Sequence, residues 1–358
     1  MRTLEESRRV MSLNSKDDVK VAAVVVTFNR KKLLLECLDA LRNQTRPPNA
    51  IFIIDGPSTD GTPEALVQEG YIKETPPQPK GQYSWKTKNM IISSSGAPIR
   101  VVYVRLYEDV GGAGGFHEGV KLAYNEGYDW IWLMDDDAEP KKNALEELLK
   151  YIKLPDVVAL KCLVVDPTGV VHVSHWNFSR FFCGGLFREY DTINLGDTKS
   201  RDTPIVVPYG SFVGLLVSST VIKEIGLPMK EFFIYNDDVE YGLRLSQIGK
   251  VYLVPQSVIV HKGDSPQTKR KKSTTKWGLV KRYYSIRNQI YIVKKYKWNI
   301  GSFLVLLKCY LYHISKTRPE YVSRWRWVYF ITSAYLDGIR GVFDNKKPKR
   351  ILYGGKRA

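Results

Sequence analysis

The sequence predicts an α/β domain with a largely parallel sheet, followed by a basic, mainly helical region. Apolar, β-branched runs alternate with segments of helical periodicity, which indicates strand–helix units. The runs are apolar on both faces, as in strands that helices cover on either side. Charge then divides the chain: the formal net charge is +17, yet residues 262–358 carry 24 Lys and Arg against four Asp and Glu. This region therefore has an electrostatic role of its own.

The first elements follow in order along the chain. A buried strand is predicted at 19–30, a helix at 31–44 and a second strand at 50–56. A turn and a short helix that begins at Thr62, before Pro63, come next. The first helix has an apolar stripe at helical spacing, made of Leu34, Cys37, Leu38 and Leu41.

The following segments continue the alternation. Residues 74–99 are polar and rich in Pro, Gly, Ser and Lys, which predicts an insertion or loop. A third strand at 99–106 leads through a glycine-rich turn into a helix. A fourth strand comes next, with a helix after Pro140, and shorter strands are expected near 157–166 and 204–219.

Composition argues against several classes of protein. The N-terminal "MRTLEESRRVMSLNSKDD" lacks the apolar core of a signal peptide. No uncharged apolar run reaches 18 residues, and the longest candidate, 300–314, is interrupted by Lys308. The four cysteines lack metal-site spacing, which predicts a reduced, cytoplasmic protein.

Four predicted strand ends carry groups typical of a ligand site. "TFNR" follows the first strand, "DGPSTDGT" the second and "EDVGGAGGF" the third, and three aspartates close the fourth. Parallel strands present their carboxyl ends at one edge of the sheet, where ligands bind in doubly wound folds. One polar strand end is usually only a turn, whereas four together favour a site.

Asp135, Asp136 and Asp137 need a counter-charge, because adjacent carboxylates repel one another. One interpretation is a solvated turn in which an aspartate caps the following helix. The other is a site for Mg²⁺ or Mn²⁺, held by one or two carboxylates while substrate phosphates complete the coordination. In an extended segment, Asp135 and Asp137 point to one side and Asp136 to the other.

The segment "GGAGG" at 111–115 has the composition of many ordinary turns. Its functional interpretation is close backbone approach to an anion, with free amides near the start of the next helix. It does not follow the first strand, so it does not indicate a dinucleotide site.

Two later segments add candidate side chains. Asp237, Asp238, Glu240 and Arg244 follow an aromatic segment. The acids are either the ordinary acidic first turn of a helix or a place for a general base acting on a sugar hydroxyl. His261 ends a late apolar strand and is either structural or a metal ligand.

Taken in order, "VVVTFNR", "IDGPSTDGT", "GGAGGF", "WIWLMDDDAEP", "FFIYNDDVEYGLR" and "VIVHK" resemble the motif series of family 2 glycosyltransferases with the GT-A fold. The likeness is greatest to bacterial rhamnosyltransferases and galactofuranosyltransferases, and "KRYYSIRNQIYIV" continues it. The resemblance implies a Rossmann-like catalytic domain at 21–262, with a nucleotide-sugar half at 21–140 and an acceptor half at 141–262. Residues 1–20 are then an extension, and 263–358 a basic, aromatic-rich helical region.

The resemblance also implies roles for individual residues. Asp238 matches the catalytic base, and the ligands of Mn²⁺ or Mg²⁺ would be Asp135, Asp137 and His261. The acceptor side would include Asp237, Glu240 and Arg244. Residues facing the donor would be Thr27, Asn29, Asp55, Asp109, Gly114, Gly115 and Asp136. The family commonly has Asn where this chain has Asp109, which bears on the identity of the sugar.

The implied reaction is an inverting transfer of a hexosyl group from a nucleotide-diphosphate sugar, UDP-galactofuranose before dTDP-rhamnose. The acceptor would be a lipid-linked saccharide in bacterial surface polysaccharide biosynthesis, at the inner face of the cell membrane. A homo-oligomer is left open. A catalytically inactive GT-A scaffold is disfavoured, because every expected acid is present.

The basic C-terminal region has more than one interpretation. It is an amphipathic helical subdomain packed on the catalytic domain, a docking surface for an anionic membrane, or both. Nucleic-acid binding is the competing class, since basic charge beside aromatics is also its signature. No nucleic-acid motif is present and the acidic cluster would be unexplained, so we expect no nucleic-acid partner.

Overall fold

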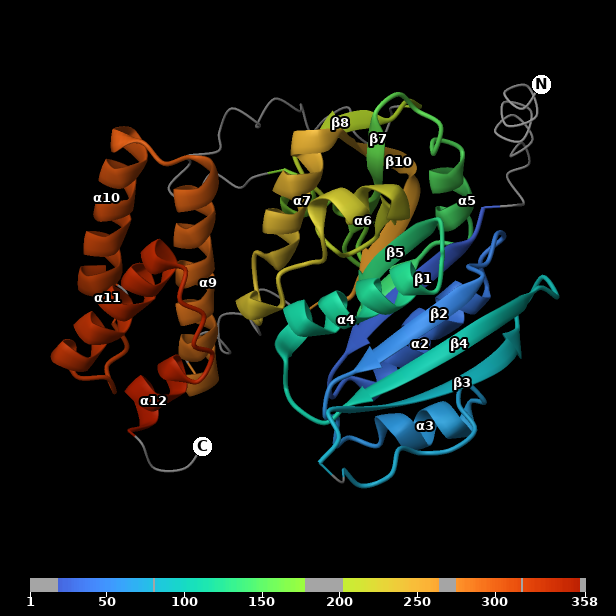
Figure 1. The fold of residues 1–358 in the computed structure, drawn as a ribbon, viewed down its shortest axis with the longest axis horizontal. Helices are drawn as coiled ribbons and strands as arrows, with labels where there is room; N and C mark the ends of the chain where they lie inside the picture. The colour runs from blue at the N-terminus through green and yellow to red at the C-terminus, as the bar shows by residue number, and fades with distance from the viewer. Residues whose placement is uncertain (1–18, 80, 178–201, 264–274, 317, 355–358) are drawn as a thin grey trace, which may run out of the picture.

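The computed structural model describes residues 19–79, 81–177, 202–263, 275–316 and 318–354. Within these residues, one mixed sheet has the strand order β3-β4-β2-β1-β5-β9-β7-β10-β6, with β8 paired to β10 (Figure 1). The strands are β1 (Val21–Thr27), β2 (Ala50–Asp55), β3 (Ser84–Ile92), β4 (Pro98–Leu106), β5 (Trp130–Asp135), β6 (Ala138–Pro140), β7 (Val157–Val165), β8 (Ile205–Val207), β9 (Leu215–Ser218) and β10 (Lys250–His261).

Helices cover both faces of the sheet. On one face lie α2 (Lys31–Arg42), α3 (Thr62–Gln68) and α5 (Ala144–Leu149). On the other lie α4 (Gly111–Asn125), α6 (Ser219–Ile225) and α7 (Asp237–Ile248). Successive residues of β1 alternate between the two apolar clusters, as the pleat of a doubly covered strand requires.

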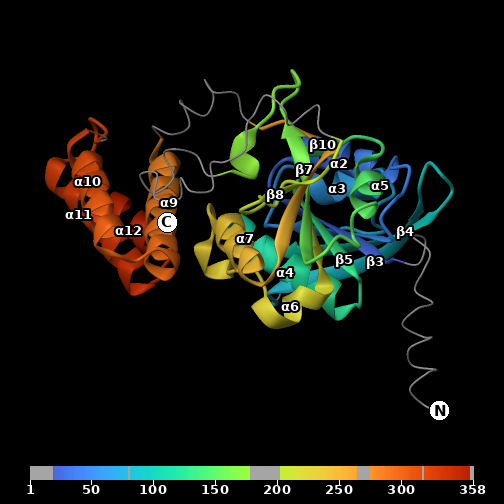
Figure 2. The ribbon, with the colours of Figure 1, turned by 90° about the horizontal axis from the view of Figure 1, so that it is seen from above.

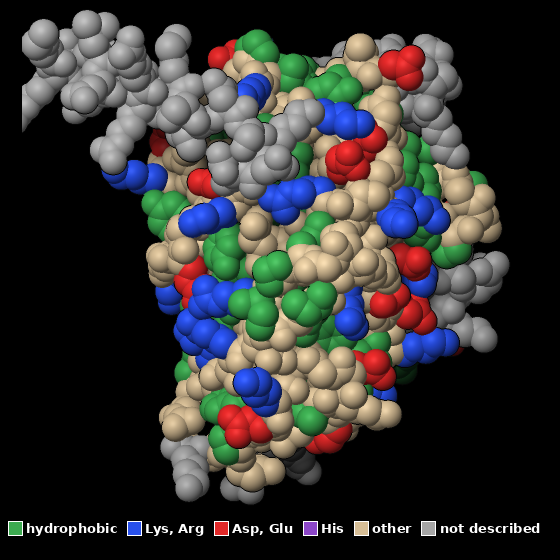
Figure 3. Space-filling view, turned by 90° about the vertical axis from the view of Figure 1, so that its right-hand side faces the viewer, with side chains coloured by type: hydrophobic (Ala, Val, Ile, Leu, Met, Phe, Trp, Pro, Cys, Tyr) green, Lys and Arg blue, Asp and Glu red, His purple; other side chains and the backbone are tan. Residues whose placement is uncertain are grey.

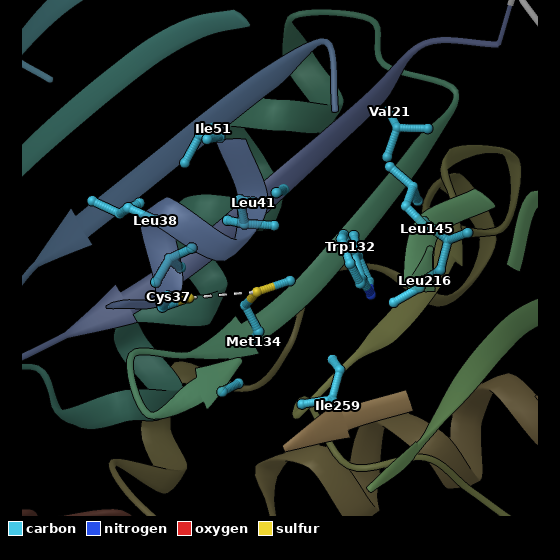
Figure 4. Close-up of a cluster of buried hydrophobic side chains, with 14 of the residues drawn as sticks. Val21, Cys37, Leu38, Leu41, Ile51, Trp132, Met134, Leu145, Leu216 and Ile259 are labelled. Atoms are coloured by element: carbon cyan, nitrogen blue, oxygen red, sulfur yellow. Dashed lines mark hydrogen bonds between the residues drawn. The ribbon is translucent and has the colours of Figure 1, made fainter. Parts of the chain in front are cut away.

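Figure 4 shows the first of these clusters, where β5 meets α2. Trp132 and Met134 of β5 are fully buried, and the sulfur of Cys37 lies 3.8 Å from that of Met134. Leu38 and Leu41 belong to the same cluster, so the apolar stripe predicted for this helix is confirmed.

The strands β4, β2, β1 and β5 are parallel neighbours. In this register Thr27 lies beside Asp55, and Asp55 lies beside Arg105. The prediction that four strand ends open at one edge is therefore confirmed. Antiparallel strands extend the sheet on both sides of this parallel group. On one side β3 pairs with β4, and on the other β9 pairs with both β5 and β7.

Two local predictions are wrong. Residues 74–99 are not a continuous loop, because β3 forms the sheet edge within them. Its side chains alternate between exposed and half-buried, so only one face is covered and its sequence is mostly polar. The glycine-rich segment is not a turn before a helix, since α4 begins at Gly111. The short strands expected near 204–219 are present as β8 and β9.

The C-terminal helices lie beside α7 (Figure 2). They are α9 (Lys276–Tyr296), α10 (Ile300–Lys316), α11 (Arg324–Arg340) and α12 (Lys347–Tyr353). Their buried side chains form a third apolar cluster together with four residues from α7 and the segment before it: Phe232, Phe233, Val239 and Leu243. The interpretation of a helical region packed on the α/β domain is thus confirmed. Among the described helices, none is long and apolar enough to cross a bilayer.

Candidate functional site at the strand edge

The three aspartates lie at the end of β5 and on the tight turn to β6, not in one extended segment. The three side chains have partly different contacts. Asp136 accepts a hydrogen bond of 2.8 Å from Thr27 Oγ1. Asp135 and Asp137 lie with His261, and the ligand atoms of these three residues are all within 4.8 Å of one another. The structure therefore brings together the three residues expected to hold a metal.

One oxygen of this group is suited to a cation. Asp137 Oδ1 is buried and accepts no hydrogen bond from the described residues, although His261 Nε2 lies 3.1 Å away. A buried carboxylate oxygen without a donor is costly unless a positive charge meets it. Carboxylate oxygens together with one imidazole nitrogen suit a divalent ion such as Mn²⁺. The two carboxylates and the imidazole therefore fit the expected metal ion.

Arg30 supplies a counter-charge that the sequence argument missed. Its Nη1 lies 3.1 Å from Asp136 Oδ1 and 2.7 Å from Asp137 Oδ2. The only signal for it was the last letter of "TFNR", directly after the first strand. Arg30 lies between β1 and α2, and from there it offsets part of the acidic charge of the turn after β5.

The pKa values show which carboxylate lacks compensation. Burial, and secondly the charge of Asp137, raises the pKa of Asp135 to about 7. Burial raises the pKa of Asp136 to about 6, with Arg30 opposing it. Burial also acts on Asp137, yet its contacts with His261 and Arg30 hold its pKa below the usual value. Asp135 is thus the carboxylate that gains most from an added cation.

Asn29 and Asp55, which were expected to face the nucleotide sugar, accept hydrogen bonds from neighbouring loops and strands. Asn29 has a left-handed backbone (φ +54°), and its Oδ1 accepts a 2.7 Å hydrogen bond from the amide of Thr59. Asp55 is fully buried and accepts hydrogen bonds from Ser58, Tyr103 and Arg105 at 2.6–2.7 Å. These bonds shape the loops at the strand edge, and the contact of either side chain with a nucleotide stays a prediction.

Two glycines of the predicted anion-binding segment serve packing. Gly114 and Gly115 are buried within α4, and a Cβ at Gly115 would lie 2.5 Å from Val26 Cγ1. Two amides expected to be free have protein acceptors: Gly111 N donates to Asp109 Oδ1 at 3.1 Å, and Ala113 N donates to the carbonyl of Phe233 at 3.1 Å. Asp109 itself is exposed.

The second acidic group begins α7. Asp238 is half-buried, and its Oδ1 accepts a 2.8 Å hydrogen bond from the amide of Val239. Burial raises the pKa of Asp238, opposed first by the hydrogen bond from the Val239 amide and then by the charge of Lys161. Burial also raises the pKa of Asp237 well above its usual value, followed by the charges of Asp238 and Asp135. The acids of α7 and of β5 therefore influence one another.

Glu240 and Arg244 have partners within the protein. Glu240 is fully buried, and it accepts hydrogen bonds of 2.9 Å from Arg244, Lys295 and Tyr296. Arg244 also donates to the carbonyl of Leu227 at 3.0 Å. The contacts of Glu240 tie α7 to α9, and that of Arg244 ties α7 to the segment after α6. A contact of either residue with an acceptor saccharide stays a prediction.

The loop before Asp238 is strained and is held by α9. Phe233, Tyr235 and Asn236 all have positive φ angles, between 64° and 69°. Such a conformation costs roughly 1–3 kcal/mol for each non-glycine residue. Asn288 of α9 is fully buried, and its Nδ2 donates to three carbonyls of this loop at 2.8–3.1 Å, those of Phe232, Ile234 and Tyr235. The C-terminal region thus fixes the backbone that leads into Asp238.

Two further histidines lie next to His261. His172 and His175 each have a ring nitrogen within 4.8 Å of it and of each other, and the ring centroids of His175 and His261 are 5.1 Å apart. His175 Nδ1 lies 2.7 Å from Ser211 Oγ. Neither histidine was predicted from the sequence, although their H-x-x-H spacing is visible there.

Known proteins resemble this chain in sequence. A family model described as "Glycosyl transferase family 2" matches residues 22–76 and 86–222. Galactofuranosyltransferase GlfT1 of Mycobacterium tuberculosis is 30% identical over 64% of this chain and 65% of that protein. The chain thus covers less than two thirds of that relative's length. An N-acetylglucosaminyl-diphospho-decaprenol L-rhamnosyltransferase of the same species is 26% identical over 68% of this chain and 76% of that protein.

Solved structures share the fold at low identity. GalNAc-T7 with UDP, GalNAc and Mn²⁺ has a TM-score of 0.53 and 14% identity, over 94% of this chain and 58% of that chain. TarS of S. aureus has a TM-score of 0.50 and 13% identity, over 94% and 52%. The fold is the GT-A fold expected from the sequence, with a helical C-terminal region added.

Proposed function

The chain belongs to glycosyl transferase family 2, and we propose on this basis that it transfers a hexosyl group with inversion, from a nucleotide-diphosphate sugar to a saccharide hydroxyl. The observation that carries the proposal is the meeting of Asp135, Asp137 and His261, whose ligand atoms all lie within 4.8 Å of one another. Such a group is expected where a diphosphate has to be held through a divalent cation.

Asp135, Asp137 and His261 would hold Mn²⁺ or Mg²⁺ at the edge of the sheet. When bound, the ion supplies positive charge to the leaving diphosphate. Thr27 donates a hydrogen bond to Asp136, and Arg30 pairs with both Asp136 and Asp137. Mn²⁺ is the ion in the solved structure of GalNAc-T7, which shares the fold.

Asp238 would act as the general base. The acceptor oxygen attacks the anomeric carbon, the bond from that carbon to the diphosphate oxygen breaks, and the hydroxyl proton moves to Asp238. The amide of Val239 orients this carboxylate, and Asn288 holds the loop before it. A positioned base contributes about 10²–10⁴-fold, which corresponds to roughly 3–5 kcal/mol of barrier.

For the donor we favour UDP-galactofuranose, with dTDP-rhamnose next. Support comes from the relatives, which are named galactofuranosyltransferase and rhamnosyltransferase. The name of the second relative also specifies a diphospho-decaprenol acceptor, which supports a lipid-linked saccharide acceptor here. We therefore place the enzyme at the cytoplasmic surface of an anionic membrane, acting on bacterial surface glycans.

Donor binding and hydrolysis with a panel of nucleotide sugars test the proposal, each with Mn²⁺ or Mg²⁺. We expect metal-dependent turnover and thermal stabilisation with one donor, both lost in Asp137→Ala. Asp39→Ala, which removes an exposed aspartate of α2, is the matched control and should behave as the wild type. Asp238→Asn should keep the stabilisation and lose transfer. If no nucleotide sugar gives a response with either metal, the proposal fails.

A further inference from the structure

The outer face of α10 is an exposed apolar stripe. Its side chains are between 43% and 83% exposed, and they recur at spacings of three and four residues: Ile300, Phe303, Leu304, Leu307, Leu311 and Tyr312. These six residues form the α10 stripe. Exposed apolar patches of this length on a helix indicate an interaction surface.

The α10 stripe is additional to the face that α10 uses for folding. Leu306 is buried in the C-terminal cluster, and Tyr310 bonds Thr332 of α11 at 2.8 Å between their hydroxyl groups. The helix therefore has one apolar face packed on the protein and a second one directed to solvent. Folding of the C-terminal region does not require the second face.

Exposed side chains of α11 extend this surface. Trp325 is 84% exposed, and Tyr329 and Leu336 are exposed as well. Tyr329 and Leu336 lie three and four residues from Thr332, which contacts α10, so they border that helix. Tryptophan and tyrosine beside aliphatic side chains are typical of surfaces that enter the boundary between lipid headgroups and acyl chains.

Basic side chains predominate around the stripe, and the segment between α10 and α11 adds one exposed acid, Glu320. Lys294, Lys308, Arg324 and Arg326 are exposed on and beside α10, and α10 contains no Asp or Glu. Asp337, the one acid of α11, is buried and bonded to Tyr283 and Lys347. On the face of the molecule farthest from α10, by contrast, acidic and basic side chains are interspersed (Figure 3).

We propose that the α10 stripe and its basic margin dock this enzyme on the surface of an anionic lipid bilayer. Aliphatic side chains enter the acyl boundary while Lys and Arg meet the headgroups. A nucleic acid would gain nothing from burying Ile and Leu, because its bases stack on aromatic rings. A second copy of the chain would bring the same positive charge to the interface. A bilayer alone matches both the apolar stripe and the charge.

This inference rests on the proposed function only for its biological setting, and its test does not use the reaction. The full chain is mixed with vesicles of phosphatidylcholine alone, or with three parts in ten of phosphatidylglycerol, and then floated on a density gradient. We expect the protein to float with the anionic vesicles only, and more weakly at high salt.

The decisive variant is Leu304→Glu/Leu307→Glu/Leu311→Glu, which should bind anionic vesicles at least tenfold more weakly. Met90→Glu/Ile92→Glu places two glutamates at exposed apolar positions of the edge strand β3 and should bind as the wild type. Both variants should keep the thermal stabilisation by metal and donor, which separates a failure of docking from a failure of the proposed function.

Three outcomes would overturn the inference. The wild type could fail to float with anionic vesicles, or the α10 variant could float as well as the wild type. Alternatively, sedimentation could show a dimer that the α10 variant loses while vesicle binding persists, which would assign the stripe to a second copy.

Discussion

Lys161 is a fully buried amine whose charge acts on the proposed base. Burial lowers the pKa of Lys161 to about 8, and its positive charge lowers the pKa of Asp238 against the effect of burial. A general base works only as the carboxylate, so transfer is lost as pH falls through the pKa of Asp238. Removing the positive charge makes the carboxylate less stable and raises that pKa.

We therefore expect Lys161→Met to move the acidic limb of the rate profile to higher pH. The measurement is kcat against pH with metal and both substrates saturating. Lys150→Met, at an exposed lysine after α5, should leave the limb in place. An unmoved limb in Lys161→Met would show that the titrating base is not Asp238.

At the scale of elements, α4 approaches β1 through two glycines. A Cβ at Gly115 would lie 2.5 Å from Val26 Cγ1, and one at Gly119 would lie 2.3 Å from Val24 Cγ1. Gly115→Ala should therefore lower the free energy of unfolding by about 1–3 kcal/mol, because the added methyl overpacks the core. Gly112→Ala, with nothing within 4 Å of its Cβ, should be neutral or slightly stabilising. Thermal unfolding of the two variants distinguishes them.

Helix α9 acts on the site through one amide. Asn288→Ala removes the donor shared by three loop carbonyls, so the strained loop before Asp238 should relax. We expect a fall in kcat with little change in metal affinity or donor-induced stabilisation. Gln289→Ala changes the next residue of α9 and should retain the wild-type rate. A wild-type kcat in Asn288→Ala would mean that the loop holds its conformation without α9.

Elements with local patterns could be predicted from the sequence, and contacts between distant segments could not. The alternation of Val21, Ala22 and Ala23 between two cores follows from an apolar run alone. Strand β3 was missed because one of its faces is exposed, which leaves Lys and Asn in the pattern. Arg30 meets Asp137 across 107 residues, and no local spacing reports such a pair.

The same limit applies to the candidate site. Its acids and His261 could be named because each ends or follows a recognisable strand or aromatic segment. Glu240 was expected beside an acceptor for the same reason, yet its partners Lys295 and Tyr296 come from a helix 55 residues further on. The role of a buried carboxylate depends on the charges around it, and these charges are brought together only by the tertiary fold.

For the whole molecule, we propose that the catalytic part (21–262) does not reach full stability without the region that follows. Phe232, Phe233, Val239 and Leu243 lie in the same apolar cluster as α9 and α11. The complete chain should unfold in one transition, and a chain ending at residue 262 should unfold at a lower temperature because these side chains become exposed. Calorimetry of both proteins checks this. Two separate transitions in the complete chain would contradict it.

The close approach of α4 to β1 has a consequence for how this protein changes over time. No side chain separates the helix from the strand at Gly115 and Gly119, so each position gains a methyl group only if its valine neighbour gives up volume. Substitutions at Gly115 and Val26, and likewise at Gly119 and Val24, should then arise as compensating pairs. The added methyl alone would displace the helix, whose first turn contacts the loop of the proposed base, and the smaller valine replacement alone would leave a cavity.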